Sequence, residues 1–188
     1  MNFPILSSLI LLPVVGSLFL LFSKDKNSNT GKYVALFTSF VNFLISLYLW
    51  YQFDPTTSDF QFVEDREWLK GIINYKIGID GISILFIVLT ALITPLCIIS
   101  VNNTVKDRLR DFLIAILVME SLMIGVFCSL DLVIFYLFFE AGLIPMFLII
   151  GIWGGARRVY SAFKFFLYTL LGSVLMLIAI ISIYWISG

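Results

Sequence analysis

Residues 112–153 read FLIAILVMESLMIGVFCSLDLVIFYLFFEAGLIPMFLIIGIW, two long apolar runs that meet in a short turn at Asp131. A helix that crosses about 30 Å of hydrocarbon needs about 20 largely apolar residues. Lipid offers the backbone no hydrogen-bond partners, and neither run shows the period-2 alternation of a barrel strand. This stretch therefore predicts two neighbouring transmembrane helices.

The rest of the chain repeats this pattern. Of its 188 residues, 61% are hydrophobic and 13% charged, against about 45–50% and about 25% in a soluble domain. A water-soluble globule is therefore excluded. The predicted fold is all-α, a polytopic bundle of transmembrane helices in a single domain over residues 1–188, with an external loop at 54–78. Its six predicted spans cover approximately 3–23, 33–53, 79–101, 112–130, 132–153 and 162–186.

The first span has no basic region before it and no small-residue cleavage site after it, which predicts a retained helix rather than a signal peptide. Basic residues decide the predicted orientation, because Lys and Arg gather in loops on the cytoplasmic side. Eight follow the odd-numbered spans, namely Lys24, Lys26, Lys32, Lys106, Arg108, Arg110, Arg157 and Arg158, and three lie in the long loop, namely Arg66, Lys70 and Lys76. The loops after the first, third and fifth spans are thus predicted to lie in the cytoplasm or matrix. In the long loop, Phe62 and Trp68 predict an aromatic anchor at the interface.

Several classes of function are disfavoured. The net charge is zero and the basic residues form short clusters, which argues against nucleic acid as a partner. There is no His, and Cys97 and Cys128 both lie inside apolar runs. This placement predicts small packed residues rather than metal ligands or a disulfide.

The charges inside the apolar runs are the candidates for function. Asp131 lies in the turn, where either water or an N-terminal helix cap is predicted to satisfy its carboxylate. Glu120 and Glu140 each lie ten residues from Leu130, so at 1.5 Å per residue both are about 15 Å deep. Inserting an acidic residue there costs about 2.5–3.5 kcal/mol.

Desolvation favours the neutral form of a carboxyl at that depth. A group that exchanges its proton near ambient pH can accept a proton from one side and release it to the other. The alternative is structural: a neutral glutamate can also hold two helices together by a hydrogen bond. The sequence leaves open whether Glu120 and Glu140 face each other.

Two further residues bear on these carboxyls. Pro145 removes the backbone bond to the carbonyl of Ala141 and is expected to bend or open the helix beside Glu140. Lys164 begins the last span, where it either snorkels to the interface or serves as a basic partner that modulates a carboxylate.

Several motifs carry a family resemblance. They are FFEAGLIPM at 138–146, GIWGG at 151–155, KFFLYTLLGS at 164–173, FQFVE at 60–64 and GIDGIS at 78–83. The chain resembles the antiporter-like chain M, or subunit 4, family of proton-pumping NADH:quinone oxidoreductase, respiratory complex I. The resemblance covers nearly the whole chain but only the N-terminal part of a family fold of about fourteen helices. It therefore implies a fragment, a split-gene product or an incomplete reading.

The resemblance implies a proton-translocating subunit in which Glu140 is the proton-pathway carboxylate, Glu120 a lateral relay and Lys164 a further residue of the path. It implies no cofactor and no metal in this chain; NADH, FMN, iron–sulfur clusters and quinone belong to partner subunits. The sequence agrees, since it has neither a GxGxxG loop nor a cysteine cluster. The implied partners are other membrane-arm subunits of complex I and the lipid bilayer, not further copies of this chain.

Two alternatives stay open at this stage. The first is a subunit of a multi-subunit cation/proton antiporter with no redox partner, although the loop segment at 60–64 favours the respiratory group. The second is a scaffold bundle whose buried acids only hold helices together. The expected location is a bacterial plasma membrane or, alternatively, the mitochondrial inner membrane.

Overall fold

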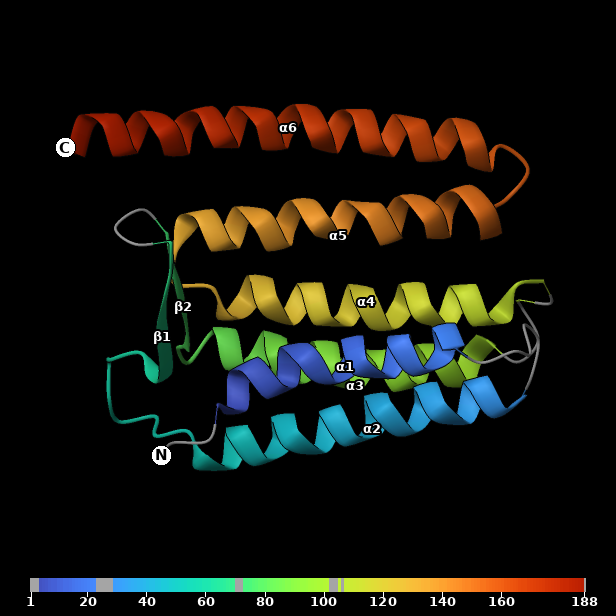
Figure 1. The fold of residues 1–188 in the computed structure, drawn as a ribbon, viewed down its shortest axis with the longest axis horizontal. Helices are drawn as coiled ribbons and strands as arrows, with labels where there is room; N and C mark the ends of the chain where they lie inside the picture. The colour runs from blue at the N-terminus through green and yellow to red at the C-terminus, as the bar shows by residue number, and fades with distance from the viewer. Residues whose placement is uncertain (1–3, 23–28, 70–72, 102–104, 106, 188) are drawn as a thin grey trace.

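The computed structural model describes residues 4–22, 29–69, 73–101, 105 and 107–187. Six long helices lie side by side with a small β-hairpin at one end (Figure 1). The helices are α1 (Ile5–Phe22), α2 (Asn29–Gln52), α3 (Ser83–Ser100), α4 (Leu109–Cys128), α5 (Leu132–Trp153) and α6 (Arg158–Ser187). In the described part of the chain, these six are long and apolar enough to cross a membrane. The predicted all-α bundle of a multi-pass integral membrane protein is confirmed.

The helices follow the predicted spans, but several begin at other residues. Helix α3 begins four residues after the predicted start at 79, because residue 79 is the last of strand β2. Helices α2 and α6 each begin four residues before the predicted starts at 33 and 162, and α4 begins three before the predicted start at 112. The reason is that hydropathy detects only the apolar part of a helix, whereas polar first turns extend beyond it. Several residues of the predicted spans and loops lie outside the described part of the chain, namely Phe3, Ser23, Lys24, Lys26, Lys70 and Lys106.

The predicted external loop contains a β-hairpin that the sequence analysis did not predict. Strand β1 (Gln61–Leu69) pairs antiparallel with β2 (Ile73–Ile79). Along β2, Tyr75, Ile77 and Ile79 alternate with other residues, which is the period-2 signal of a half-buried strand. Ile77 and Ile79 are fully buried in the core.

Of the two residues of the aromatic anchor predicted for this loop, Phe62 is partly buried and packs against the hydrophobic core. The reason is the strand pairing, which folds this segment back over the helix ends. The side chain of Trp68 lies outside the described residues.

The hairpin joins the start of α1 to the turn between α4 and α5. The carboxylate of Glu64 accepts hydrogen bonds from the backbone N–H of Leu6 (2.9 Å) and of Ser7 (3.3 Å), and from the Ser7 hydroxyl. On the other strand, the carbonyl of Lys76 accepts a bond from the N–H of Leu130 (3.0 Å). Segments far apart in the sequence are thereby held at one end of the bundle.

Acidic side chains bind the first N–H groups of all three odd-numbered helices at this end. Besides Glu64 on α1, Oδ1 of Asp80 accepts from Ile82 and Ser83 at the start of α3, at 3.1 and 2.7 Å. Hydrogen bonds from the Ser83 backbone and hydroxyl hold the pKa of Asp80 below its usual value. Oδ1 of Asp131 accepts from the N–H of Val133 (2.8 Å) and of Ile134 (3.2 Å), which confirms the helix cap, one of the two predicted alternatives, at the start of α5.

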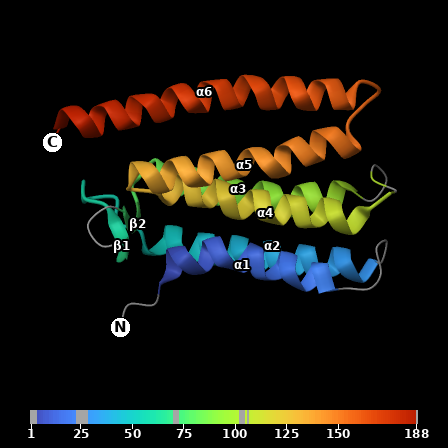
Figure 2. The same ribbon diagram turned by 45° about the horizontal axis from the view of Figure 1, so that its top comes forward.

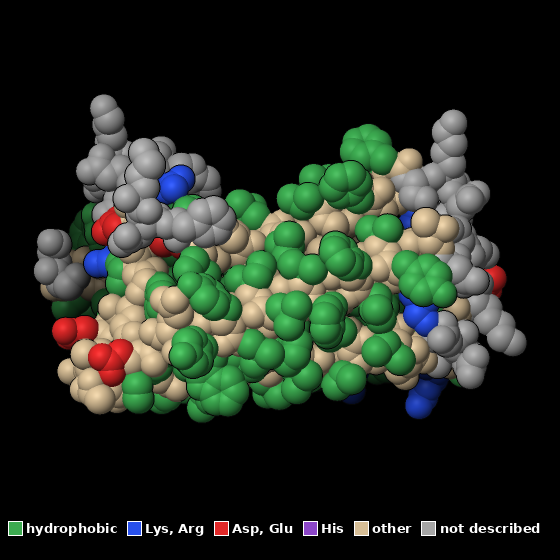
Figure 3. Space-filling model, turned by 90° about the horizontal axis from the view of Figure 1, so that it is seen from below, with side chains coloured by type: hydrophobic (Ala, Val, Ile, Leu, Met, Phe, Trp, Pro, Cys, Tyr) green, Lys and Arg blue, Asp and Glu red, His purple; other side chains and the backbone are tan. Residues whose placement is uncertain are grey.

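The packing is densest among α1 to α4, whereas α6 lies at the edge beside α5 (Figure 2). Close approach needs small residues, and Gly16 of α1 lies against Thr38 of α2: a Cβ at Gly16 would be 2.5 Å from Thr38 Cγ2. Apolar side chains cover the middle of the face in Figure 3, and charged ones are confined to its two ends. This distribution suits a hydrocarbon belt between two aqueous surfaces.

Candidate functional site

The two glutamates of the α4–α5 pair lie at matching positions on neighbouring helices, with Glu120 buried and Glu140 partly buried. Helices α4 and α5 run antiparallel from the turn at Asp131 (Figure 1). Glu120 lies eight residues before the last residue of α4, and Glu140 eight residues after the first residue of α5. At 1.5 Å per residue, both carboxyls are about 12 Å from the shared turn. The helix bounds therefore agree with the matched depth expected from the sequence.

Glu120 faces α2. Its side chain is 2% exposed, and its Oε1 accepts a hydrogen bond of 2.9 Å from Nδ2 of Asn42, which is 0% exposed. Sequence reasoning missed Asn42, although a signal was present: it is a strongly polar side chain in the middle of an apolar span. The sequence does not fix helix rotation, so it could not show which helix this amide faces.

Three buried oxygen atoms lack a hydrogen-bond partner among the described residues. They are Oε2 of Glu120, Oδ1 of Asn42 and Oε2 of Glu140. Leaving a buried polar group unpaired costs about 1–3 kcal/mol, so native proteins keep few of them, and each calls for an explanation. Two of the three belong to the glutamates singled out by the sequence. Both carboxyls thus have an oxygen able to take a proton without first losing a hydrogen bond.

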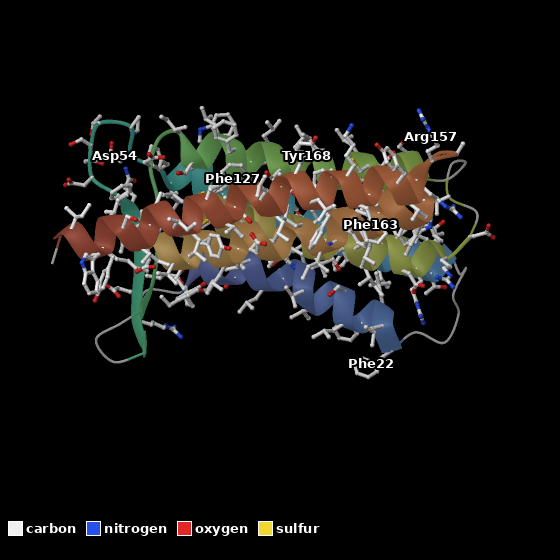
Figure 4. The ribbon with its side chains drawn as sticks, turned by 90° about the horizontal axis from the view of Figure 1, so that it is seen from above. Phe22, Asp54, Phe127, Arg157, Phe163 and Tyr168 are labelled. Carbon is white, nitrogen blue, oxygen red and sulfur yellow. The ribbon has the colours of Figure 1, made fainter. Side chains whose placement is uncertain are left out.

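A mostly apolar groove of about 740 Å³ lies beside Glu120, between α3, α4 and α5. Thr90 and Thr94 line its α3 side, and Met146 and Ile149 line its α5 side. Phe127, labelled in Figure 4, belongs to the same lining and stacks on Phe86 with ring centroids 5.1 Å apart. The groove brings Glu120 next to the helix that carries Glu140, but no hydrogen bond between the two glutamates is found in the described part of the chain.

A second groove, of about 900 Å³, lies between α1, α4 and α5, and Ala141 is part of its lining. Helix α5 runs without interruption through Pro145, so the opening predicted beside Glu140 is not observed. Neighbouring helices can sustain a membrane helix across a proline. On the same side, the hydroxyl of Ser121 donates to the carbonyl of Ile10, which ties the residue after Glu120 to α1.

The contacts of Lys164 in the described part of the chain involve neither Glu120 nor Glu140. Its side chain is exposed on α6, and Nζ is 6.0 Å from the centre of the Tyr168 ring. Figure 4 shows Tyr168 and Phe163 on this helix, and Phe163 packs edge-on against Phe147 of α5. Within the described residues Lys164 forms no ion pair. Among the described residues, Lys164 is therefore paired with neither carboxyl.

In the described part of the chain, no group of three or more His, Cys, Asp or Glu side chains is placed to hold a metal ion. Cys128 is buried and Cys97 is exposed on α3, and both are free thiols.

Residues 129–188 match the family model described as NADH:quinone oxidoreductase/Mrp antiporter, TM. NADH-quinone oxidoreductase subunit M of Rhodobacter capsulatus is 59% identical over 164 residues, covering 87% of this chain and 31% of the relative. NADH-ubiquinone oxidoreductase chain 4 of Marchantia polymorpha is 48% identical over 185 residues, covering 97% of this chain and 37% of the relative. The chain thus spans about a third of the length of these curated relatives.

Among solved structures, a chain of the membrane-bound sulfane sulfur reductase, an archaeal respiratory membrane complex, matches with a TM-score of 0.77. The match covers 96% of this chain and 28% of that chain, with 19% sequence identity. At this identity the likeness shows the fold alone. It agrees with the helix arrangement described above.

Proposed function

We propose that this chain, which belongs to the NADH:quinone oxidoreductase/Mrp antiporter family of membrane proteins, is a proton-translocating membrane-arm subunit of an NADH:quinone oxidoreductase, complex I. The observation that carries the proposal is the pair of glutamates at matching depth on α4 and α5, each with a buried oxygen that has no partner among the described residues. Structural acids that only join helices would be expected to have both oxygens satisfied.

In this proposal Glu140 takes up a proton on one side of the membrane and releases it toward the other. Glu120, on the neighbouring helix at the same depth, exchanges protons laterally. Water must bridge the two carboxyls, because no direct hydrogen bond joins them. NADH oxidation and quinone reduction take place in partner subunits, and their energy reaches these carboxyls through contacts with other membrane-arm subunits.

The alternative function, a cation/proton antiporter subunit without redox partners, shares the family model. The relatives named above, subunit M and chain 4 of NADH oxidoreductases, support the respiratory assignment. Purification from the native membrane separates the two: under our proposal NADH:quinone reductase subunits come with this chain. Isolation of the chain in an assembly without them would overturn the respiratory assignment.

The proton-transfer role is tested by Glu140→Gln in the assembled complex, assayed for proton pumping in inside-out vesicles. We expect pumping to fall by more than about tenfold with assembly retained on a native gel, because an amide keeps the shape of the side chain and its capacity to form hydrogen bonds but exchanges no proton. The matched control is Asp65→Asn, the same change of charge at an exposed strand position, with pumping unchanged. Normal pumping in Glu140→Gln would leave Glu140 as a helix-packing residue.

A further inference from the structure

We infer that Asn42 is the positioning residue of Glu120, and that the two side chains form a reciprocal acid–amide pair when Glu120 carries a proton. The inference rests on the proposed function insofar as it treats Glu120 as a proton relay. It adds α2, which sequence reasoning left without a role, to the proton-transfer site.

Asn42 differs from the other polar residues on its face of α2. Ser39, Asn42 and Ser46 recur at helical spacing, and all three are fully buried. The hydroxyl of Ser39 donates to the carbonyl of Leu36 and that of Ser46 to the carbonyl of Phe43, at 3.1 and 2.7 Å. Each of these two serine hydroxyls thus has its hydrogen-bond acceptor within its own helix, as is common for small polar residues at close contacts between membrane helices. Asn42 instead reaches across to α4.

The unpaired atoms of the two side chains complement each other. Nδ2 of Asn42 already donates to Oε1 of Glu120, and the two buried atoms left over are Oδ1 of the amide and Oε2 of the carboxyl. Both are acceptors while Glu120 is ionised, so neither can satisfy the other. A proton on Oε2 converts that oxygen into a donor, and a small side-chain rotation then lets it bond Oδ1. One added proton thereby satisfies both atoms, and no existing hydrogen bond is broken.

Asn42 also selects the oxygen that carries the proton. Because its N–H group occupies Oε1, the incoming proton binds Oε2, and a flip that exchanges the two carboxyl oxygens would break the 2.9 Å bond. The ionised state keeps one hydrogen bond to α2, and the protonated state has two. The link between α2 and α4 therefore responds to the protonation state of Glu120.

Charged neighbours do not compete for this role. Helix α1 contains no titratable side chain, and Cys97 is the titratable residue of α3 and lines the groove beside Glu120. The titratable residues of α5 are Tyr136 and Glu140, and neither is hydrogen-bonded to Glu120 in the described part of the chain. On α2 the titratable side chains are Lys32, Tyr33, Tyr48 and Tyr51. Those of α4 itself are Arg110, Asp111 and Cys128, and β2, with Tyr75 and Lys76, meets α4 at its far end, beside Ser129. The Asn42 amide is thus the polar group that contacts the carboxyl.

Infrared difference spectroscopy on the assembled complex tests the pair, with pH as the perturbation. Glu120→Gln identifies the C=O stretching band of the protonated Glu120 carboxyl by removing it. In Asn42→Leu, which has a similar volume and no hydrogen-bonding group, we expect this band to move to higher frequency. Pumping should fall by about two- to tenfold, the factor that one hydrogen bond represents.

The matched control is Ser46→Ala, one turn along the same buried face of α2, because its hydroxyl bonds its own helix; band and pumping should both stay as in the wild type. If Asn42→Leu does not assemble, Asn42→Ser, which reproduces the neighbouring serines, is expected to give the same band shift. An unchanged band in the Asn42 variant, or no band removed by Glu120→Gln, would overturn the pair. If the wild-type complex pumps no protons, the proposed function is wrong. The infrared bands still show in that case whether Asn42 and Glu120 form the pair.

Discussion

Helices α4 and α6 are similarly apolar but differently surrounded. In the most apolar stretch of α4, 50% of residues are buried, against 6% in α6. Within the bundle of α1 to α4, Glu120 has its amide partner in Asn42. Helices α5 and α6 present Glu140 and Lys164, which have no such partner among the described residues. The two regions therefore differ in how their polar side chains are held. The packing of α1 to α4 fixes the carboxyl of Glu120, whereas on α5 and α6 the side chains of Glu140 and Lys164 are left for contacts with other molecules.

The largest stability difference between the two regions is expected from matched glycine substitutions. Gly16→Ala places a Cβ 2.5 Å from Cγ2 of Thr38, a stiff β-branched side chain, whereas a Cβ at Gly172 of α6 meets nothing within 4 Å. We expect Gly16→Ala to destabilise the fold by about 1–3 kcal/mol. We expect Gly172→Ala not to destabilise it, because alanine is favoured over glycine inside a helix by about 0.5–1 kcal/mol. Unfolding in detergent by denaturant titration measures both. Equal effects would mean that α6 is as tightly packed as α1 and α2.

A smaller effect is expected where the hairpin holds α1. Glu64→Ala removes the acceptor for the N–H groups of Leu6 and Ser7, and the expected cost is about 1–2 kcal/mol, the value of a helix N-terminal cap. The same titration measures it, with Asp65→Ala, an exposed neighbour on β1, as the control. If the two variants lose the same stability, the contact between hairpin and helix adds nothing.

The smallest of these effects is expected at the start of α5, in the loosely packed region. Asp131→Ala removes the cap on Val133 and Ile134 and should cost about 1 kcal/mol, whereas Asp131→Asn should cost only a few tenths because asparagine also caps. Hydrogen exchange of the first-turn amides of α5 checks this locally. Unchanged protection in Asp131→Ala would show that the turn is held by packing alone.

Hydropathy alone predicted the helices, and residue counting predicted the matched depth of Glu120 and Glu140, because both depend only on length and composition. The Asp131 cap was also predictable, since a short turn leaves few other acceptors. Asn42 could not be assigned to Glu120 because these helices are apolar on every side. The spacing of apolar residues therefore does not show which face of a helix points toward which neighbour. The hairpin was missed although Tyr75, Ile77 and Ile79 alternate, because its other strand is rich in charged residues.

The hairpin fixes the position of α1 along its axis relative to α4. Through Glu64 it fixes the start of α1, and through Lys76 it fixes the turn after α4. A slip of α1 by one helical turn, about 5.4 Å, would break the Glu64 contacts and carry the Ile10 carbonyl away from Ser121, the neighbour of Glu120. The height of Glu120 along the bundle is therefore set by a hairpin that lies outside the six helices that, in the described part of the chain, are long enough to cross a membrane.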